Sequence, residues 1–271
     1  KGVDDKLTTQ FIQPINYFCF CADTYVFKKL KNVKKENAIC FIFQPDKARR
    51  CSNIGIKALI LVKKLRPDVK IYLYGSDVDI KLDVEMENLH IMPITKCNEL
   101  YNKCSVGVCM SSSNPSRIPF EMMAAGLPVV DLYRENNLYD IPDDGVLLAD
   151  TSPEAVATAI IKLLDDEKLR NKLGKAGYEY MQKYPIERGF DEFLKFVNDM
   201  LNDVNVPDGN VTKIYKREPV LPSQEVINVM DAIKEVPIAP KNSSDLLRKL
   251  VVIKRFIRRK YVSAIHKIFR V

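Results

Sequence analysis

The sequence of 271 residues lacks the features that define several protein classes. No apolar run approaches the roughly 20 residues that a membrane-spanning helix needs. Neither Gly-x-Gly-x-x-Gly nor Gly-x4-Gly-Lys-Ser/Thr occurs, so the usual loops that cradle dinucleotides and nucleoside triphosphates are missing. There is no signal peptide and the first residue is Lys1 rather than Met, so we expect a fragment of a longer protein.

Histidine is scarce, and cysteine forms no framework. With only His90 and His266 in the chain, no serine, cysteine or lysine nucleophile has a recognisable partner. The seven cysteines are an odd number and stop at Cys109, which favours reduced thiols in a cytoplasmic protein over a secreted disulfide scaffold. Cys19 and Cys21 resemble half a metal site, but nothing completes it, so we expect no metal.

The positive charge belongs to one segment. The chain carries +7 overall, but residues 244–271 hold nine Lys/Arg and one acidic residue, which leaves −1 for the remainder. This distribution argues against nucleic acid as a partner of the whole chain. A second cluster of five lysines lies within Lys28–Lys35, and we interpret it as a solvated face.

Short apolar runs alternate with helical patterns from Ala38 onward. This alternation predicts an α/β fold with a doubly wound, Rossmann-like parallel sheet. We expect Ser52 and Thr95 to cap two of the helices, and the Ser152-Pro153-Glu154 pattern to begin a third. The predicted strands are 38–43, 69–74, 89–92, 106–110, 128–132 and 145–148, and the predicted helices begin at 52, 95, 119, 153, 166 and 186.

The composition changes after Leu201. Five of the fifteen prolines fall within 202–243, which predicts an extended linker with one short helix at about 223–236. Residues 244–271 repeat apolar side chains at helical spacing with Lys and Arg on other faces, which predicts a basic amphipathic helix. Such a helix suits a membrane surface or a partner protein, and both interpretations stay open. The predicted organisation is therefore 1–37 lead-in, 38–201 domain, 202–243 linker and 244–271 helix.

The segment 110–132 offers the clearest chemistry. It leads from a predicted strand end through a hydroxyl-rich loop into a helix that opens near Pro119. Ligands of open α/β sheets bind at such strand ends, and the unpaired N–H groups of a helix start favour a diphosphate. Glu121 falls in the first turn, where its carboxylate suits a ribose diol or, equally, caps its own helix.

The motif PFEMMAAGLPVVD at 119–131 resembles the signature of the C-terminal, nucleotide-sugar-binding domain of family 4 glycosyltransferases with the GT-B fold. The second Glu of that Glu-x7-Glu signature matches Glu121, whereas the first falls on Ser113, which is a departure. The loop SSSNPSRIPFEMMAAG and the lead-in FIFQPDKARRCSNIGIKAL are similar to rhamnosyltransferases of bacterial surface-polysaccharide synthesis. The resemblance spans roughly residues 13–184.

The resemblance implies roles for individual residues. Arg49 would neutralise the departing diphosphate, with Glu121 as the second catalytic residue. Ile94 falls where the family's backbone usually pairs with the base. The implied substrate-binding residues are Arg50, Gly75, Ile94, Ser113, Asn114, Ser116 and Arg117.

The resemblance also implies an activity. The chain would be the donor-binding half of a retaining enzyme that moves a sugar, with rhamnose as the candidate, from a dTDP-, UDP- or GDP-sugar to a glycan or lipid-linked glycan. No metal or covalent cofactor is implied. An amino-terminal acceptor domain would be needed and is missing from this sequence. We expect a cytoplasmic location, at the inner face of the cell membrane if residues 244–271 bind lipid. The alternative is a non-catalytic nucleotide-binding or scaffolding module, which the serine at position 113 supports.

Overall fold

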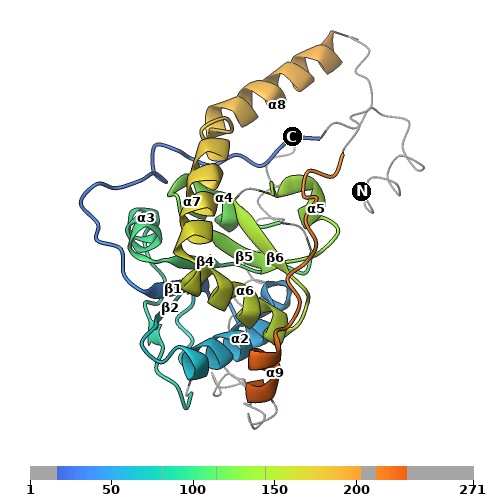
Figure 1. The fold of residues 1–271 in the computed structure, drawn as a ribbon. Helices are drawn as coiled ribbons and strands as arrows, with labels where there is room; N and C mark the ends of the chain where they lie inside the picture. The colour runs from blue at the N-terminus through green and yellow to red at the C-terminus, as the bar shows by residue number, and fades with distance from the viewer. Residues whose placement is uncertain (1–16, 81, 114, 144, 203–211, 231–271) are drawn as a thin grey trace, which may run out of the picture. The chain divides into compact units, whose positions relative to one another are not determined.

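The computed structural model describes residues 17–80, 82–113, 115–143, 145–202 and 212–230 (Figure 1). The chain divides into two compact units. One unit comprises Lys1–Asp77 and Leu82–Val236 and holds every described helix and strand. Of the other unit, which comprises Val78–Lys81 and Pro237–Val271, the structure describes residues 78–80 alone. The predicted amphipathic helix at 244–271 therefore lies outside the described residues.

A parallel sheet forms the centre of the first unit, and it confirms the predicted α/β fold class. Its order is β3-β2-β1-β4-β5-β6, and every pairing is parallel. In the register, Ile39 of β1 lies between Ile71 of β2 and Val106 of β4. The strands are β1 (Ala38–Ile42), β2 (Lys70–Tyr74), β3 (Glu87–Asn88), β4 (Val106–Val108), β5 (Val129–Leu132) and β6 (Val146–Ala149).

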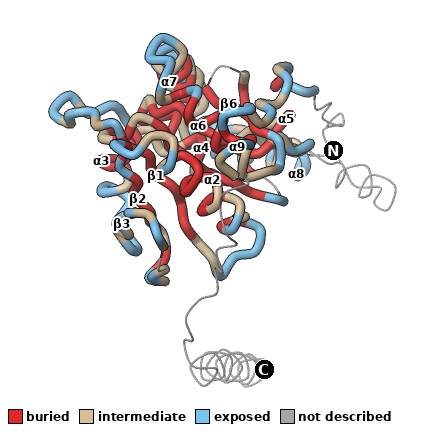
Figure 2. Tube along the Cα trace, turned by 60° about the horizontal axis from the view of Figure 1, so that its bottom comes forward, coloured by how far each residue is buried: buried red, intermediate tan, exposed pale blue. Residues whose placement is uncertain are grey.

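Helices cover both faces of this sheet (Figure 1). On one face lie α2 (Ser52–Leu65), α6 (Pro153–Asp165) and α9 (Gln224–Met230), and on the other lie α3 (Ile94–Lys103), α4 (Ile118–Ala124) and α7 (Glu167–Met181). Burial concentrates in the strands and in the helix sides that face them (Figure 2). Covered on both faces, the strands β1, β4 and β6 are continuous apolar runs, as is typical of a parallel sheet.

The helix starts differ in how well their local sequence predicts them. Ser152 Oγ accepts the amide of Ala155 at 3.1 Å, so the predicted cap of α6 is confirmed. The predicted cap of α2 is wrong, because Cys51, with φ of +50°, precedes the helix and Ser52 is its first residue. The predicted cap of α3 is also wrong, because Pro93 precedes the helix, which begins at Ile94, and Thr95 is its second residue.

The predicted strand at 89–92 is also wrong. The third strand lies two residues earlier, at Glu87–Asn88. Beyond it the chain still bonds to β2, because Leu89 N donates to Leu73 O and Gly75 N donates to His90 O, both at 2.8 Å. His90 then adopts φ of +57°, a left-handed conformation that ends the extended path.

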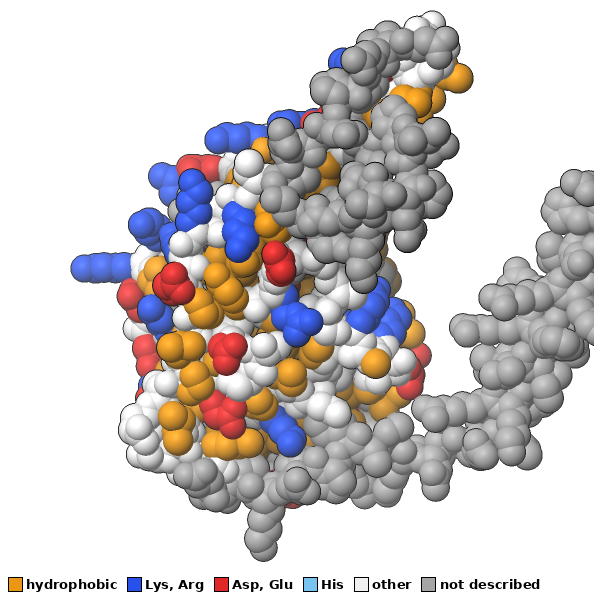
Figure 3. Space-filling view, turned by 90° about the vertical axis from the view of Figure 1, so that its right-hand side faces the viewer, with side chains coloured by type: hydrophobic (Ala, Val, Ile, Leu, Met, Phe, Trp, Pro, Cys, Tyr) orange, Lys and Arg blue, Asp and Glu red, His pale blue; other side chains and the backbone are white. Residues whose placement is uncertain are grey.

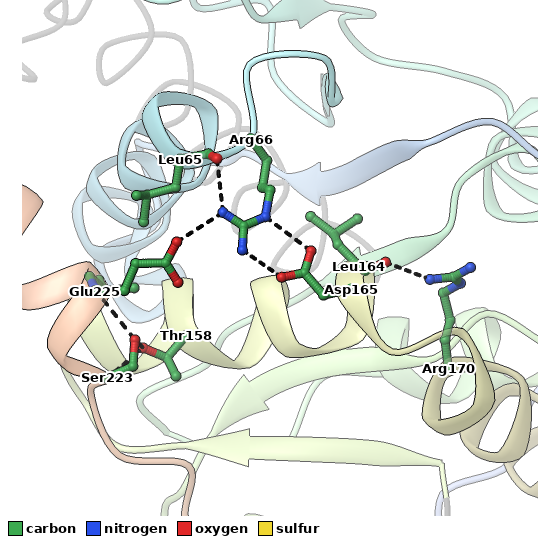
Figure 4. A network of polar contacts seen from close by, with 9 residues as sticks. Leu65, Arg66, Thr158, Leu164, Asp165, Arg170, Ser223 and Glu225 are labelled. Carbon is green, nitrogen blue, oxygen red and sulfur yellow. Dashed lines mark hydrogen bonds and ion pairs between the residues drawn. The ribbon is translucent and has the colours of Figure 1, made fainter.

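The segment 212–230, at the C-terminal end of the first unit, packs against β6 and against helices α2 and α6. Tyr215 is buried, and its hydroxyl accepts the amide of Leu148 in the edge strand β6 at 3.0 Å. Val220 continues the contact by donating to Leu148 O at 2.9 Å. In Figure 4, Arg66 at the end of α2 bonds both Asp165 of α6 and Glu225 of α9. These contacts attach α9 to the face formed by α2 and α6.

Two further helices complete the described part. The short α5 (Asn137–Asp140) follows β5 and was not predicted, because four residues carry no helical period. By contrast, α8 (Ile186–Leu201) has the bounds that the sequence predicts, although none of its residues is buried. None of the helices in the described ranges is both long and apolar enough to cross a membrane.

Candidate functional site

The switch in strand order between β1 and β4 positions the candidate site. The chain leaves β1 toward α2 on one face of the sheet and leaves β4 toward α4 on the other. In an open α/β sheet, ligands bind beside the carboxyl ends of the strands at such a switch point. The two loops at this point, 43–51 and 109–117, contain both arginines after β1 and the hydroxyl-rich stretch that the sequence singled out.

The loop after β1 is held against the loop after β4. A short 3-10 turn, Ala48–Arg50, leads through the left-handed Cys51 into α2. The carbonyl of Arg49 accepts the amide of Ser112 at 2.8 Å, which joins the two loops. This turn separates the paired arginines, because the side of the loop that Arg49 occupies is exposed whereas Arg50 is only 7% exposed.

Arg50 is buried with an incomplete set of partners. Its NH1 donates to the Cys109 thiol at 3.9 Å, a long contact to a weak acceptor. Among the described residues, Arg50 Nε has no hydrogen-bond partner. A buried guanidinium with an unsatisfied N–H keeps donor capacity toward an anion at the switch point.

Asp131 at the end of β5 is a second buried ionisable group near Arg50. It is fully buried, and its Oδ1 accepts the amide of Leu132 at 2.7 Å, whereas Oδ2 has no hydrogen-bond partner in the described part of the chain. Burial raises the pKa of Asp131 to about 8, although its hydrogen bonds and the charge of Arg50 act in the opposite direction. The carboxyl group is therefore mostly protonated at neutral pH.

Glu121 lies in the first turn of α4 and is half-buried. Burial raises the pKa of its carboxyl group, while the positive charges of Arg117 and Arg50 lower it. The carboxylate therefore lies within electrostatic reach of two arginines that come from different loops. This is the strongest convergence of predicted site residues in the described structure.

Gly75 and Ile94 lie farther along the carboxyl edge of the sheet. Gly75 ends β2 with φ of +96°, a conformation that favours glycine. Its carbonyl accepts Gln44 Nε2 at 3.4 Å, which links the end of β2 to the loop after β1. Ile94 begins α3 and is 59% exposed, so the residue is accessible at this end of the sheet.

The loop residues after β4 behave differently from one another. Ser116 is buried and its Oγ accepts the amide of Ile118 at 3.3 Å, so this hydroxyl supports the start of α4. Ser113 is exposed, and its carbonyl accepts Asn136 Nδ2 at 2.6 Å. Arg117 is exposed directly before α4. Asn114, also predicted to bind substrate, lies outside the described residues.

The sequence analysis did not single out Asp131 and Asn137, two buried polar residues at the carboxyl ends of the strands. Asp131 was assigned to a predicted strand. Its one unusual feature in the sequence is that it is an acid in the otherwise apolar run PVVDL, which could have identified it as a candidate site residue. Asn137 is likewise buried, and its Nδ2 donates to Leu132 O at 2.7 Å. In the described ranges, no three His, Cys, Asp or Glu side chains lie close enough to hold a metal ion.

The arrangement is suited to a ligand with a phosphate group and a polyol. Arg49, Arg50 and Arg117 supply positive charge from two loops, and arginine binds phosphate oxygens in pairs. Glu121 supplies an acceptor for hydroxyl groups. Together these groups offer both kinds of contact within one edge of the sheet.

The sequence also matches known proteins. Residues 37–161 match the family model described as WsaF, C-terminal domain. The O-antigen biosynthesis protein RfbC of Myxococcus xanthus is 28% identical over 163 residues. That alignment covers 58% of this chain but only 13% of RfbC.

Solved structures share the fold at low sequence identity. The sucrose-phosphate synthase of Thermosynechococcus elongatus is 16% identical, with a TM-score of 0.60 over 75% of this chain and 57% of its own. The pneumococcal O-GlcNAc transferase GtfA, solved with UDP and GlcNAc, is 14% identical, with a TM-score of 0.56 over 74% of this chain and 44% of its own. By fold and by sequence, the chain is therefore similar to the C-terminal domains of GT-B glycosyltransferases.

Proposed function

We propose that this chain is the donor-binding half of a retaining glycosyltransferase that moves a sugar from a nucleoside diphosphate sugar to a polysaccharide acceptor. One observation carries the proposal: Arg50, Arg117 and Glu121 converge at the switch point between β1 and β4. The names of the relatives support it, since RfbC is an O-antigen biosynthesis protein and GtfA was solved with UDP.

The arginines serve the leaving group in this proposal. When the bond from the sugar to the diphosphate breaks, negative charge grows on the phosphate oxygens. Arg49 is exposed and can contact those oxygens, while the buried Arg50 adds a fixed positive charge behind it. Fixed cations near growing negative charge lower the barrier without reorganisation at the moment of reaction.

The remaining predicted residues position the nucleotide. Glu121 accepts hydrogen bonds from the ribose hydroxyls, and the exposed backbone at Ile94 meets the base. Gly75 suits the close packing and the positive φ at the end of β2, because a Cβ there would lie 3.3 Å from the side chain of Ile42. The hydroxyls of Ser113 and Ser116 and the charge of Arg117 belong to the loop that would face the sugar and phosphates.

The finer assignments rest on the resemblance of the loop after β4 to rhamnosyltransferases of surface-polysaccharide synthesis. Rhamnose is therefore the candidate sugar, and a cytoplasmic site of action follows from the location of nucleotide sugars. The chain spans 13% of RfbC and about half of the solved structures that it matches. The acceptor would be bound by a separate domain, so this chain alone is expected to bind nucleotide without transferring sugar at normal enzymatic rates.

Calorimetry with UDP, dTDP and GDP tests the proposal directly. We expect one of the three to bind, and Arg49→Ala to weaken it about tenfold or more, since a charge-assisted hydrogen bond contributes about 1.5–3 kcal/mol. Arg188→Ala is the matched control, because Arg188 is an exposed arginine on α8. The proposal fails if none of the nucleotides binds, or if the two variants lose affinity equally.

A non-catalytic module with the same fold is the second candidate. The observation that favours it is Ser113, which stands where the resemblance predicts the first Glu of the signature. Both candidates bind nucleotide, so binding does not separate them. A transfer assay on the full-length protein does, because the non-catalytic module would bind the donor yet leave it uncleaved in the presence of acceptor.

A further inference from the structure

A cavity of about 400 Å³ opens at the amino ends of the strands, whereas the candidate site lies at their carboxyl ends. Its lining includes Lys35, which precedes β1, Ser105, which precedes β4, and Pro128, which precedes β5. The cavity therefore lies at the amino ends of the strands. At about 3.3 Å per residue, the five residues of β1 separate it from the switch point by roughly 15 Å.

The lining of this cavity is strongly cationic. It contains Lys29, Lys35, Arg170 and Lys175 against one acid, Glu167. Lys175 pairs with Glu179 at 3.8 Å, but within the described ranges none of the other three cations forms an ion pair. Like charges gathered in one concave site repel one another, and the single acid Glu167 does not balance the four cations.

Two of the cations are fixed in place by carbonyl groups. Lys35 belongs to the lysine cluster that the sequence assigned to a solvated face, yet its Nζ donates to Cys104 O at 2.7 Å. Burial of that amine lowers the pKa of Lys35, and the charges of Arg170 and Lys29 lower it further. Lys35 as a residue is exposed, as the sequence predicts, but its amine is bound to the backbone rather than free in solvent.

Arg170 is held in the same way from the other side of the cavity. Its NH1 donates to Leu163 O at 2.9 Å and to Leu164 O at 2.8 Å, at the end of α6. In the described structure its Nε and NH2 have no such bonds, so they keep their donors for a ligand. Lys29 is oriented as well, since its Nζ lies 4.2 Å from the centre of the Tyr178 ring.

We infer that this cavity binds a small phosphate-bearing anion at a site separate from the proposed donor site. Its volume falls in the range of small-molecule pockets. Arginine and lysine side chains held in fixed positions are the usual ligands of phosphate, and the exposed Asn171 adds a polar group to the lining. The anion supplies the counter-charge that the described residues do not.

Inorganic pyrophosphate is the probe, and the glycine amides report where it binds. Gly126 and Gly174 line the cavity, so their NMR signals in the full chain should shift saturably on titration. The variant Lys29→Glu/Lys175→Glu should raise the dissociation constant at least tenfold. The matched control Lys168→Glu/Lys172→Glu makes the same charge change on exposed residues of α7 and should alter it less than twofold.

A second variant protects the test against misfolding. Asn171→Asp introduces a negative charge into the lining with nearly the same shape as the asparagine. It should also weaken binding. The inference is overturned if the two glycine signals do not shift in the unmodified chain, if the cavity variants keep its affinity, or if the control loses affinity equally. Arg49→Ala should leave the binding of pyrophosphate in the cavity unchanged. A failure of the proposed donor site can therefore be distinguished from a failure of the cavity site.

Phosphate groups occur both on small metabolites and on lipid headgroups, and a vesicle experiment separates these sources. The full chain is sedimented with vesicles that contain anionic phospholipid. If Lys29→Glu/Lys175→Glu reduces sedimentation more than Lys168→Glu/Lys172→Glu does, the phosphate is that of a lipid. Equal sedimentation of the two variants assigns the cavity to a dissolved phosphate compound.

Discussion

Arg50 and Asp131 are two buried ionisable residues next to the switch point between β1 and β4. Neither group satisfies all of its hydrogen-bonding atoms within the described residues. Buried polar atoms without partners cost stability, so proteins retain them mainly where another task requires them. Here Arg50 is incompletely bonded, while burial raises the pKa of the neighbouring Asp131 carboxyl group to about 8.

The protonation of Asp131 predicts a specific dependence of stability on pH. Its pKa is about 8 in the folded chain and near 3.8 when unfolded, so between these values the folded state binds more protons. The stability contributed by this group is therefore complete below pH 3.8 and declines as pH rises through 8. Asp131→Asn should remove that decline, which denaturant unfolding at pH 5 and pH 9 measures.

The exposed Asp68→Asn is the control for this experiment, since it makes the same change on the surface. The free energy of unfolding of Asp131→Asn, taken relative to the unmodified chain, should rise from pH 5 to pH 9. The corresponding difference for Asp68→Asn should stay constant. A constant difference for both variants would mean that Asp131 is ionised at neutral pH.

Glu121 provides a second prediction at the scale of single residues. In Glu121→Ala, nucleotide affinity should fall about 10- to 100-fold, because charge-assisted hydrogen bonds to the ribose are worth about 1.5–3 kcal/mol. The melting temperature should change little. A helix-capping role would reverse this result, with a lower melting temperature and unchanged affinity. Calorimetry and thermal melts measure both quantities, and Glu179→Ala, on the exposed side of α7, is the control.

At this scale the sequence predicts residue types better than their surroundings. It marks Arg49 and Arg50 as a pair, but only the 3-10 turn Ala48–Arg50 gives one arginine an exposed position and the other a buried one. It predicts that Lys35 is exposed, which is confirmed, but a cluster of lysines carries no sign of the carbonyls that bind its amine. The roles of Arg49 and Glu121 remain predictions.

At the scale of elements, we predict that loss of the hydrogen bond between Tyr215 and β6 lowers the stability of the folded chain. Tyr215→Phe removes the acceptor of the Leu148 amide while it keeps the ring in the core. A buried N–H left without a partner costs about 1–3 kcal/mol, so the midpoint of thermal unfolding should fall. Tyr25→Phe is the matched control, because Tyr25 is 73% exposed. Equal melting temperatures for the two variants would contradict the role of the hydroxyl.

Elements with strong local signals were predictable, and those fixed by distant contacts were not. Ser152, Pro153 and Glu154 define the start of α6 by themselves, because cap, proline and acid act within one turn. The position of β3 depends on pairing with β2 and on the left-handed His90, neither of which has a local pattern. The burial of Tyr215 likewise arises from β6, which lies far from it in sequence.

At the scale of the whole molecule, charge separates the segments of the chain. Figure 3 shows Lys and Arg side chains interspersed with Asp and Glu over the described part of one face. This mixture agrees with the near-neutral sum that remains once residues 244–271 are set aside. The strand and helix alternation was sufficient to predict the fold class, since a parallel sheet requires helical crossovers.

We predict that residues 244–271 attach the protein to anionic membranes. Each Lys or Arg near such a surface contributes about 1 kcal/mol. The full chain should therefore sediment with vesicles of anionic lipid, while a chain truncated after Lys241 should not. Binding should weaken as salt is added, because ions screen the attraction. Neutral vesicles are the control, and equal sedimentation of both proteins would favour a partner protein instead.

The covering of β6 by the segment 212–230 has a consequence for how copies of this protein behave toward one another. A strand at the end of a sheet offers unpaired amides and carbonyls to any chain that can lie beside it. Here Tyr215 and Val220 occupy those groups on β6, and the opposite end of the sheet is the two-residue β3. Neither end offers a long, open template for a foreign strand. A chain shortened to Leu201 would uncover one of them and should aggregate more readily on heating.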